Sequence, residues 1–204
     1  MLNSASGPES NGTVVLVLPR SQHNSQTPIQ PSACTKNIIQ KSSDQRSKLL
    51  ALVRSNLAAF LSEVGPGVVC LVYSVILTKG VQELAADMDM EGIVLINEYG
   101  YASQELINTM LVGRASTNVH DGDKDLGDNF ILKGIHRQSD IGFLTYFEHF
   151  GHFQVGDYFK KPKMPIWIIC SESHYSVMFS PNMDLINKSN LGAFDVVYYD
   201  ELSR

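Results

Sequence analysis

The stretch "MPIWIICSESHYSVMF", residues 164–179, contains two strand-like apolar runs interrupted by the polar segment "SES". β-Branched and aromatic residues, which favour strands, are frequent in both runs. If "HYSVMF" forms a strand, His174 and Ser176 point to one face of the sheet, and Tyr175 and Val177 point to the other. His174 then stands at the beginning of a strand, where a sheet meets a cleft and a rigid backbone can hold a side chain in place.

His174 is therefore a candidate general base. An imidazole, with an unperturbed pKa near about 6.5, can take a proton from a thiol or hydroxyl and return it to a leaving amine. A histidine bound only by neighbouring serines or backbone carbonyls would show the same spacing, so a catalytic and a structural role both remain open. Ser176, Glu172 and Asp200 could each orient the ring, and no spacing rule chooses among them.

The candidate nucleophiles are the three cysteines, Cys34, Cys70 and Cys170. Cys34 lies in a polar N-terminal stretch that offers nothing to orient it or to lower its pKa. The segment "GPGVVC", residues 65–70, could open a helix near Cys70, but Cys70 and Cys170 both lie within apolar runs. We predict that both are buried core residues, where a thiol pKa rises rather than falls.

Composition excludes several classes of protein. Three cysteines at wide spacing fit neither a disulfide framework nor paired zinc ligands, and they predict a reducing cytoplasmic or nuclear location. The 204 residues, of which 44% are hydrophobic and 18% charged, carry a net charge of -5 and therefore no basic field for nucleic acid. The longest apolar run, residues 68–77, is about half the roughly 20 residues of a spanning helix, and no signal peptide is recognised. We predict neither a nucleic-acid nor a membrane partner.

Two segments resemble metal sites in part but lack features that such sites require. "DGDKDLGD", residues 121–128, has aspartates at positions 1, 3 and 5 of an EF-hand loop, but Leu126 and Leu132 occupy the positions that need glycine and glutamate. "EHFGH", residues 148–152, holds two histidines three apart, but Gly151 is predicted to end the helix between them. We predict a solvated acidic loop at the first segment, no metal at either, and no cofactor.

The N-terminal part of the chain changes character near residue 44. Residues 1–43 are rich in Ser, Asn, Gln, Pro and Thr and are predicted to form a mostly disordered leader, in which "VVLVL" (residues 14–18) could still pair as an edge strand. Apolar residues then recur every three or four positions, which predicts a helix over residues 47–64 that is capped by Ser43 or Asp44.

Residues 44–204 are predicted to form one α+β domain, because helices prevail in the first half and strands in the second, without strict βαβ alternation. The run at residues 68–77 fits a helix or a strand, and its length favours a helix. The other predicted elements are a strand over 92–96, a helix over 103–111 capped by Ser103, a helix over 139–150, and strands over 164–170, 174–179 and 194–200.

Three segments, taken together, resemble one known family. They are "GRASTNVHDGD" (113–123), "GIHRQSDIGFLTYFEHFGHFQVGDYFKKPKMPIWIICSESHYSVMF" (134–179) and "FDVVYYDELSR" (194–204). Their sequence and order resemble the MINDY family of cysteine-type deubiquitinases, in the branch of its third and fourth members. The resemblance runs from about Arg46 to the C-terminus.

The resemblance implies a papain-like cysteine-hydrolase domain and a ubiquitin carboxyl-terminal hydrolase activity, with ubiquitin or polyubiquitin as the partner. In such a mechanism a cysteine thiolate attacks the carbonyl that joins ubiquitin to its target. A histidine activates the thiol and protonates the leaving amine, and a polar side chain helps to form the oxyanion hole. His174, in "SESHYSVMF", matches the family's catalytic histidine.

The resemblance supplies no nucleophile. The family's cysteine lies in a "GGPCGV"-like turn at a helix start, upstream of the helix predicted over residues 47–64, and neither that turn nor the oxyanion-hole glutamine is found here. Cys34, in "PSACTK", has no glycine turn around it. We therefore expect residues 44–204 to be a partial catalytic domain, incomplete at its N-terminal helical part, and inactive because loss of a nucleophile costs about 10⁶-fold in rate.

Three hypotheses follow. The product is a ubiquitin isopeptidase when a full chain supplies the cysteine, or this chain is a non-catalytic ubiquitin-binding pseudoenzyme or scaffold, or it is an unstable fragment without a role of its own. The sequence leaves the ubiquitin linkage, the substrates and the oligomeric state undetermined.

Overall fold

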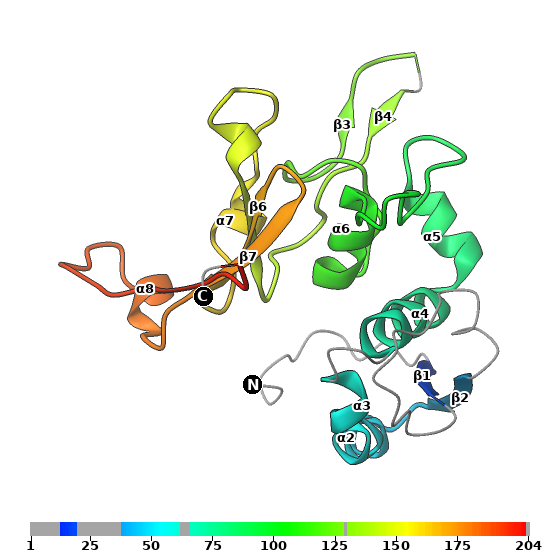
Figure 1. The fold of residues 1–204 in the computed structure, drawn as a ribbon. Helices are drawn as coiled ribbons and strands as arrows, with labels where there is room; N and C mark the ends of the chain where they lie inside the picture. The colour runs from blue at the N-terminus through cyan, green and yellow to red at the C-terminus, as the bar shows by residue number, and fades with distance from the viewer. Residues whose placement is uncertain (1–12, 20–37, 62–65, 129, 203–204) are drawn as a thin grey trace. The chain divides into compact units, whose positions relative to one another are not determined.

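The computed structural model describes residues 13–19, 38–61, 66–128 and 130–202 (Figure 1). The chain forms two compact units, Met1–Val81 and Gln82–Arg204. The described part of the first unit combines helices with a two-stranded ribbon, and that of the second combines helices with a four-stranded sheet. This mixture agrees with the predicted α+β class.

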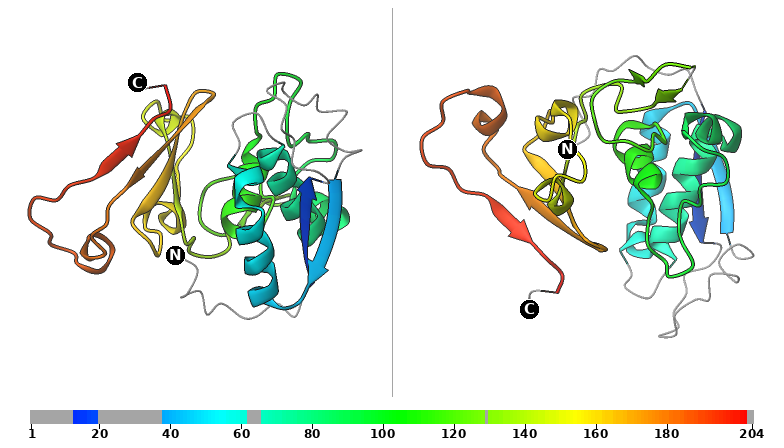
Figure 2. Two further views of the ribbon diagram at one scale, coloured as in Figure 1. Left: turned by 60° about the horizontal axis from the view of Figure 1, so that its bottom comes forward. Right: turned by 90° about the horizontal axis from the view of Figure 1, so that it is seen from above.

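The first unit contains an antiparallel ribbon of two strands, β1 (Val14–Pro19) and β2 (Ile38–Ser43). Figure 2 shows the ribbon alongside the helices of the same unit. Leu16, Val17 and Leu18 of β1 are almost completely buried. Removal of this apolar run from water stabilises an ordered strand in a segment whose composition is otherwise polar.

β1 confirms the edge strand left open for residues 14–18, whereas the prediction of a mostly disordered leader over residues 1–43 is wrong for β2. Residues 1–12 and 20–37, which include Cys34, lie outside the described residues. The proposed division between a leader and a domain over residues 44–204 stays a prediction.

One edge of β1 is covered by α4 (Gly67–Lys79), which confirms the helix favoured for this apolar run. The Ser74 hydroxyl accepts a hydrogen bond from the backbone amide of Val17 at 2.8 Å, at a buried position. One turn later, Thr78 Oγ1 accepts from the amide of Val15 at 3.0 Å. Two helix hydroxyls thus take the place of a neighbouring strand and satisfy amides that would otherwise be unpaired.

The single helix predicted over residues 47–64 is wrong, because two shorter helices, α2 (Arg46–Ser55) and α3 (Leu57–Phe60), occupy this part. Asn56 leaves helical geometry between them, and its side-chain amide donates to the carbonyl of Leu52 at 2.8 Å. Such local side-chain bonds compete with continued helix. α2 has no side-chain cap, so the predicted capping role of the preceding residues is also wrong.

The second unit begins with helical structure in α5 (Val81–Asp87) and α6 (Gln104–Val112). The prediction for α6 is confirmed, since the Ser103 hydroxyl caps it by accepting a hydrogen bond from the amide of Leu106 at 3.3 Å. The helix ends at Gly113, whose φ of 74° favours glycine.

The strand predicted over residues 92–96 is wrong. With the described residues this segment makes one isolated bridge, between Ile96 and Ala102. Val94 is 62% exposed and Gly92 has a positive φ of 79°, so the apolar run turns at the surface.

A mixed sheet forms the centre of the second unit, with the strand order β5-β6-β7-β8. β5 runs parallel to β6, and the other neighbours are antiparallel. The strands are β5 (Gly142–Thr145), β6 (Ile166–Ser171), β7 (His174–Phe179) and β8 (Val197–Tyr199). The predicted strands over residues 164–170 and 174–179 are confirmed, and that over 194–200 is confirmed for its last part.

The helix predicted over residues 139–150 is wrong, because this segment forms β5 and a short 3-10 helix, η1 (Tyr146–Glu148). Phe143 pairs with β6 and is fully buried. A Cβ at Gly142 would collide with the ring of Trp167, so the backbone here lies directly against β6. Parallel pairing and burial outweigh the helical spacing of the apolar residues.

Shorter elements complete the second unit. They are a hairpin of β3 (Lys124–Asp125) and β4 (Ile131–Leu132), and the single-turn helices α7 (Asp157–Lys160) and α8 (Asp184–Asn187). The side chain of Asp121 binds the start of α7, where its carboxylate accepts hydrogen bonds from two backbone amides at 2.8 and 2.9 Å. The core consists of Val112, Val119, Ile135, Phe143, Val155, Phe159 and Cys170.

No single helix among the described residues is long and apolar enough to cross a membrane, although α4 and α5 taken together, with a bend between them, reach the necessary length and composition.

The hydroxyl contacts of α4 yield a stability prediction. Ser74→Ala leaves the buried amide of Val17 without an acceptor, and we expect it to lower the free energy of unfolding by about 1 to 3 kcal/mol. Thr78→Ala removes the equivalent contact at an exposed position, where water replaces it, and is the matched control with a smaller loss. Urea denaturation followed by circular dichroism measures both. An equal effect of the two substitutions would contradict the role given to Ser74.

Candidate functional site

The candidate site is built on the hairpin of β6 and β7. The strands are joined by a turn of two residues, Glu172 and Ser173, so that Ser171 lies directly opposite His174. Glu172 has a φ of 55°, a left-handed conformation that is uncommon for residues other than glycine. His174 is the first residue of β7, as the sequence predicted.

Alternation along this hairpin separates His174 from Cys170. Cys170 pairs with Tyr175, one residue along each strand from the pair of Ser171 and His174, so the two pairs face opposite sides of the sheet. Cys170 is only 7% exposed and belongs to the core. The imidazole of His174 therefore lies on the face away from this thiol.

The chemistry of the described cysteines agrees with a structural role. Burial raises the pKa of the Cys170 thiol, and hydrogen bonds with Tyr175 and Thr145 act in the opposite direction without cancelling it. Cys70, in α4, is 0% exposed. The predictions that both residues are buried are confirmed, and a covered, protonated thiol is a poor nucleophile.

Asp200 is the partner of His174. Its Oδ1 atom lies 2.9 Å from Nε2 of the imidazole, with 35% of the histidine side chain and 15% of the aspartate side chain exposed. Ser176 and Glu172, the other two candidates from the sequence, make no side-chain hydrogen bond to His174 in the part of the chain that the structure describes. The geometry thus decides a choice that sequence spacing left open.

The Asp200 carboxylate has further hydrogen-bond donors. The backbone amide of Leu202 donates to Oδ1 at 2.9 Å, and the Tyr198 hydroxyl lies 3.5 Å from Oδ2. The Leu202 amide, together with His174, holds the pKa of Asp200 below its ordinary value, although desolvation opposes the shift. Asp200 is therefore ionised at neutral pH.

The second ring nitrogen of His174 remains available. A neutral imidazole has one N–H donor and one acceptor nitrogen, so donation from Nε2 to the Asp200 carboxylate leaves the lone pair on Nδ1. No hydrogen bond to Nδ1 is found among the described residues. The arrangement leaves Nδ1 able to exchange a proton with a neighbouring group.

In the segment over residues 148–152, the Glu148 carboxylate makes structural contacts. The Glu148 carboxylate binds Lys160 Nζ at 2.6 Å and accepts the amide of Val155 at 3.1 Å. The ring of His149 stacks on Tyr146 with centroids 5.7 Å apart. Within the described ranges, no group of three or more histidine, cysteine or acidic side chains is arranged to hold a metal ion.

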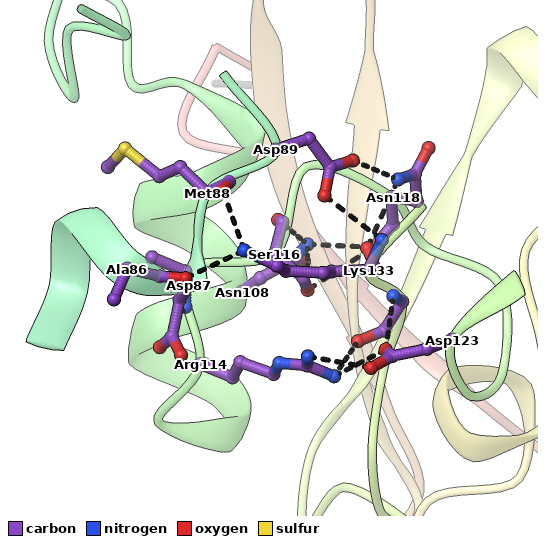
Figure 3. A network of polar contacts seen from close by, with 12 residues as sticks. Ala86, Asp87, Met88, Asp89, Asn108, Arg114, Ser116, Asn118, Asp123 and Lys133 are labelled. Carbon is purple, nitrogen blue, oxygen red and sulfur yellow. Dashed lines mark hydrogen bonds and ion pairs between the residues drawn. The ribbon is translucent and has the colours of Figure 1, made fainter. Parts of the chain in front are cut away.

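A polar network joins the first of the three family-like segments to the end of α5 (Figure 3). Arg114 binds both carboxylate oxygens of Asp123, at 2.6 and 3.0 Å. The Asp89 carboxylate accepts hydrogen bonds from the side-chain amide of Asn118 and from the backbone amide of Lys133. The ammonium group of Lys133 donates to two backbone carbonyls around the end of α5. The solvated loop predicted over residues 121–128 is confirmed for residues 123–128, which are exposed, although Asp123 also forms an ion pair with Arg114.

The network was not predicted, because the spacing of the aspartates resembles that of metal ligands and does not indicate Arg114 and Lys133 as members of the network. The hydrogen bond between Arg114 and Asp123 stabilises both charged forms, and it therefore raises the pKa of Arg114 and lowers that of Asp123. The clustering of Arg, Asn and Asp in "GRASTNVHDGD" is the signal that could have indicated a structural network.

Comparison with known proteins identifies the family. A family model described as "Deubiquitinating enzyme MINDY-3/4, conserved domain" matches residues 2–204. The chain belongs to the MINDY-3/4 family. Because the match begins at residue 2, the expectation that the resemblance begins near Arg46 is wrong.

Curated relatives carry the same family names. "Probable ubiquitin carboxyl-terminal hydrolase MINDY-4" of Bos taurus is 44% identical over 147 residues, which are 69% of this chain and 19% of the relative. The Xenopus tropicalis protein of that name is 40% identical over 161 residues, 76% of this chain and 21% of the relative. "Ubiquitin carboxyl-terminal hydrolase MINDY-3" of Homo sapiens is 44% identical over 121 residues, 59% and 27% respectively.

The chain thus spans about a fifth to about a quarter of the length of these MINDY-3 and MINDY-4 relatives. No solved structure matches it.

The depressed pKa of Asp200 predicts how the site responds to acid. Because the folded-state pKa lies below the unfolded value of about 3.9, the stabilising contribution of the ionised carboxylate is complete above that value and is lost as the pH falls through the folded pKa. Carbon-13 NMR of the side-chain carboxyl should give a lower titration midpoint in the folded chain than in a short peptide of residues 196–204. A midpoint equal to or above that of the peptide would contradict the described contacts.

Proposed function

We propose that this chain contributes the acid–base part of a deubiquitinase site, in which His174 transfers protons for hydrolysis of a bond to the carboxyl end of ubiquitin. One observation carries the proposal: His174 stands at the start of β7 with one ring nitrogen bound to Asp200 and the other unoccupied by described residues. The family and the printed names of the relatives support ubiquitin as the partner.

The proposed reaction follows from the chemistry of a thiol and an imidazole. Nδ1 of His174 accepts the proton of a cysteine thiol, and the thiolate attacks the carbonyl carbon that joins ubiquitin to its target. The imidazolium then gives its proton to the leaving amine, and a thioester remains. Water hydrolyses the thioester with the same imidazole as base. A papain-like arrangement of the site is part of this proposal.

The described cysteines do not fit the role of nucleophile. Cys170 lies on the opposite face of the sheet from His174, with its pKa raised by burial, and Cys70 is fully covered in α4. We therefore propose that neither thiol reacts with ubiquitin conjugates and that the chain by itself does not turn them over. Loss of a nucleophile of this kind lowers the rate by about 10⁶-fold.

The burial of Cys70 and Cys170 also favours a second function, which is non-catalytic binding of ubiquitin. Among the described residues no accessible thiol lies beside His174, and a surface of this kind can hold ubiquitin without cleaving it. The small number of widely spaced cysteines supports a reducing compartment, the cytoplasm or the nucleus, for either function.

An electrophilic ubiquitin probe tests the chemistry. We expect no covalent adduct at Cys70 or Cys170 after prolonged incubation of the full chain, because both of these thiols are covered. Intact-protein mass spectrometry measures the adduct. Labelling of the wild-type chain that is lost in Cys170→Ala or Cys70→Ala would contradict the assignment of these residues to the core.

A binding titration tests the partner independently. Nitrogen-15-labelled ubiquitin should show perturbed amide signals on addition of the unlabelled chain. Ser171→Arg places a bulky charge opposite His174 and should weaken this binding at least ten-fold, whereas Ser47→Arg, the same change at an exposed position of α2, should not. Unperturbed ubiquitin spectra would contradict both proposed functions.

A further inference from the structure

Asp200, the partner of His174, directly follows β8, the edge strand of the sheet. β8 pairs with β7 through three residues, and Met178 lies opposite Tyr198. Alternation puts His174, Met178 and Tyr198 on one face, and Asp200, two residues beyond Tyr198, shares that face. Continuing the register places Asp200 beside Ser176, so that it is the diagonal neighbour of His174.

The approach of β8 to β7 has few supports. All three of its residues are exposed, between 46% and 61%. The turn before it is anchored by the Ser180 hydroxyl, which donates to the carbonyl of Asp195 at 3.0 Å. The position of Asp200 therefore depends on a short ladder and one side-chain contact.

The carboxylate of Asp200 is oriented from its own strand. The Leu202 amide donates to Oδ1, the pattern of an Asx turn, and this is the same oxygen that lies 2.9 Å from His174. The Asp200 side chain is also less exposed than that of His174, 15% against 35%. The aspartate is thus the oriented member of the pair, and the imidazole is the member that receives its orientation.

We propose that Asp200 is a positioning residue: carried by β8, it keeps the proton of neutral His174 on Nε2 and directs Nδ1 to the reacting thiol. This inference rests on the proposed function for the identity of the reaction, but its geometry does not. An imidazole without this acceptor can turn over and present either nitrogen. Detachment of β8 would therefore disconnect the base while leaving the core intact.

Imidazole NMR tests the inference without ubiquitin. In the full nitrogen-15-labelled chain, at a pH where His174 is neutral, we expect a downfield Nε2–H proton that exchanges slowly with water. Asp200→Ala should speed this exchange at least ten-fold. Asp200→Asn keeps an acceptor oxygen and the Leu202 contact, and should retain the signal with a smaller downfield shift.

Matched variants separate positioning from general effects. Glu201→Gln removes one negative charge from the neighbouring residue and should leave the His174 signal unchanged. If Asp200→Ala disturbs the amide spectrum of the whole chain, the comparison of Asp200→Asn with Glu201→Gln decides. Equal His174 signals in those two variants, or an unchanged signal in a folded Asp200→Ala chain, would overturn the inference. Failure of ubiquitin binding with a normal His174 signal would contradict the proposed function alone.

Discussion

The register of β6 against β7 is the constraint on which the site depends. A turn of only two residues, Glu172 and Ser173, sets Ser171 opposite His174 and Cys170 opposite Tyr175. Because side chains alternate, a slip of one residue would move every side chain of β7 to the other face. The left-handed conformation of Glu172 is part of this turn, and it is tolerated because the paired strands hold it on both sides.

Two chemically different faces follow from that register. One face buries Cys170 with Phe143 and the rest of the core, and the resulting loss of water raises the thiol pKa. The other face carries the ionised Asp200 beside His174, partly open to solvent. A single hairpin thereby places a buried thiol and a partly exposed imidazole on opposite faces of the sheet, at positions only four residues apart in sequence.

Local signals were enough to predict the hairpin strands, the Ser103-capped helix α6 and the burial of Cys70 and Cys170, since each depends on neighbouring residues. The segment over 139–150 was mispredicted because β5 is stabilised by pairing with β6, which is distant in sequence. β1 likewise needs hydroxyls of α4. Asp200 could not be chosen from spacing, because a long connection sets the register of β8 and no sequence period records it.

The most direct test of the separation between the two faces is the alkylation rate of Cys170 in the native chain, resolved by peptide mass spectrometry, with and without His174→Ala. An imidazole on the opposite face cannot activate the thiol, so the account predicts slow modification at the same rate in both proteins. A rate at least ten-fold lower in the His174→Ala chain would show that the imidazole reaches the sulfur, and would contradict the account.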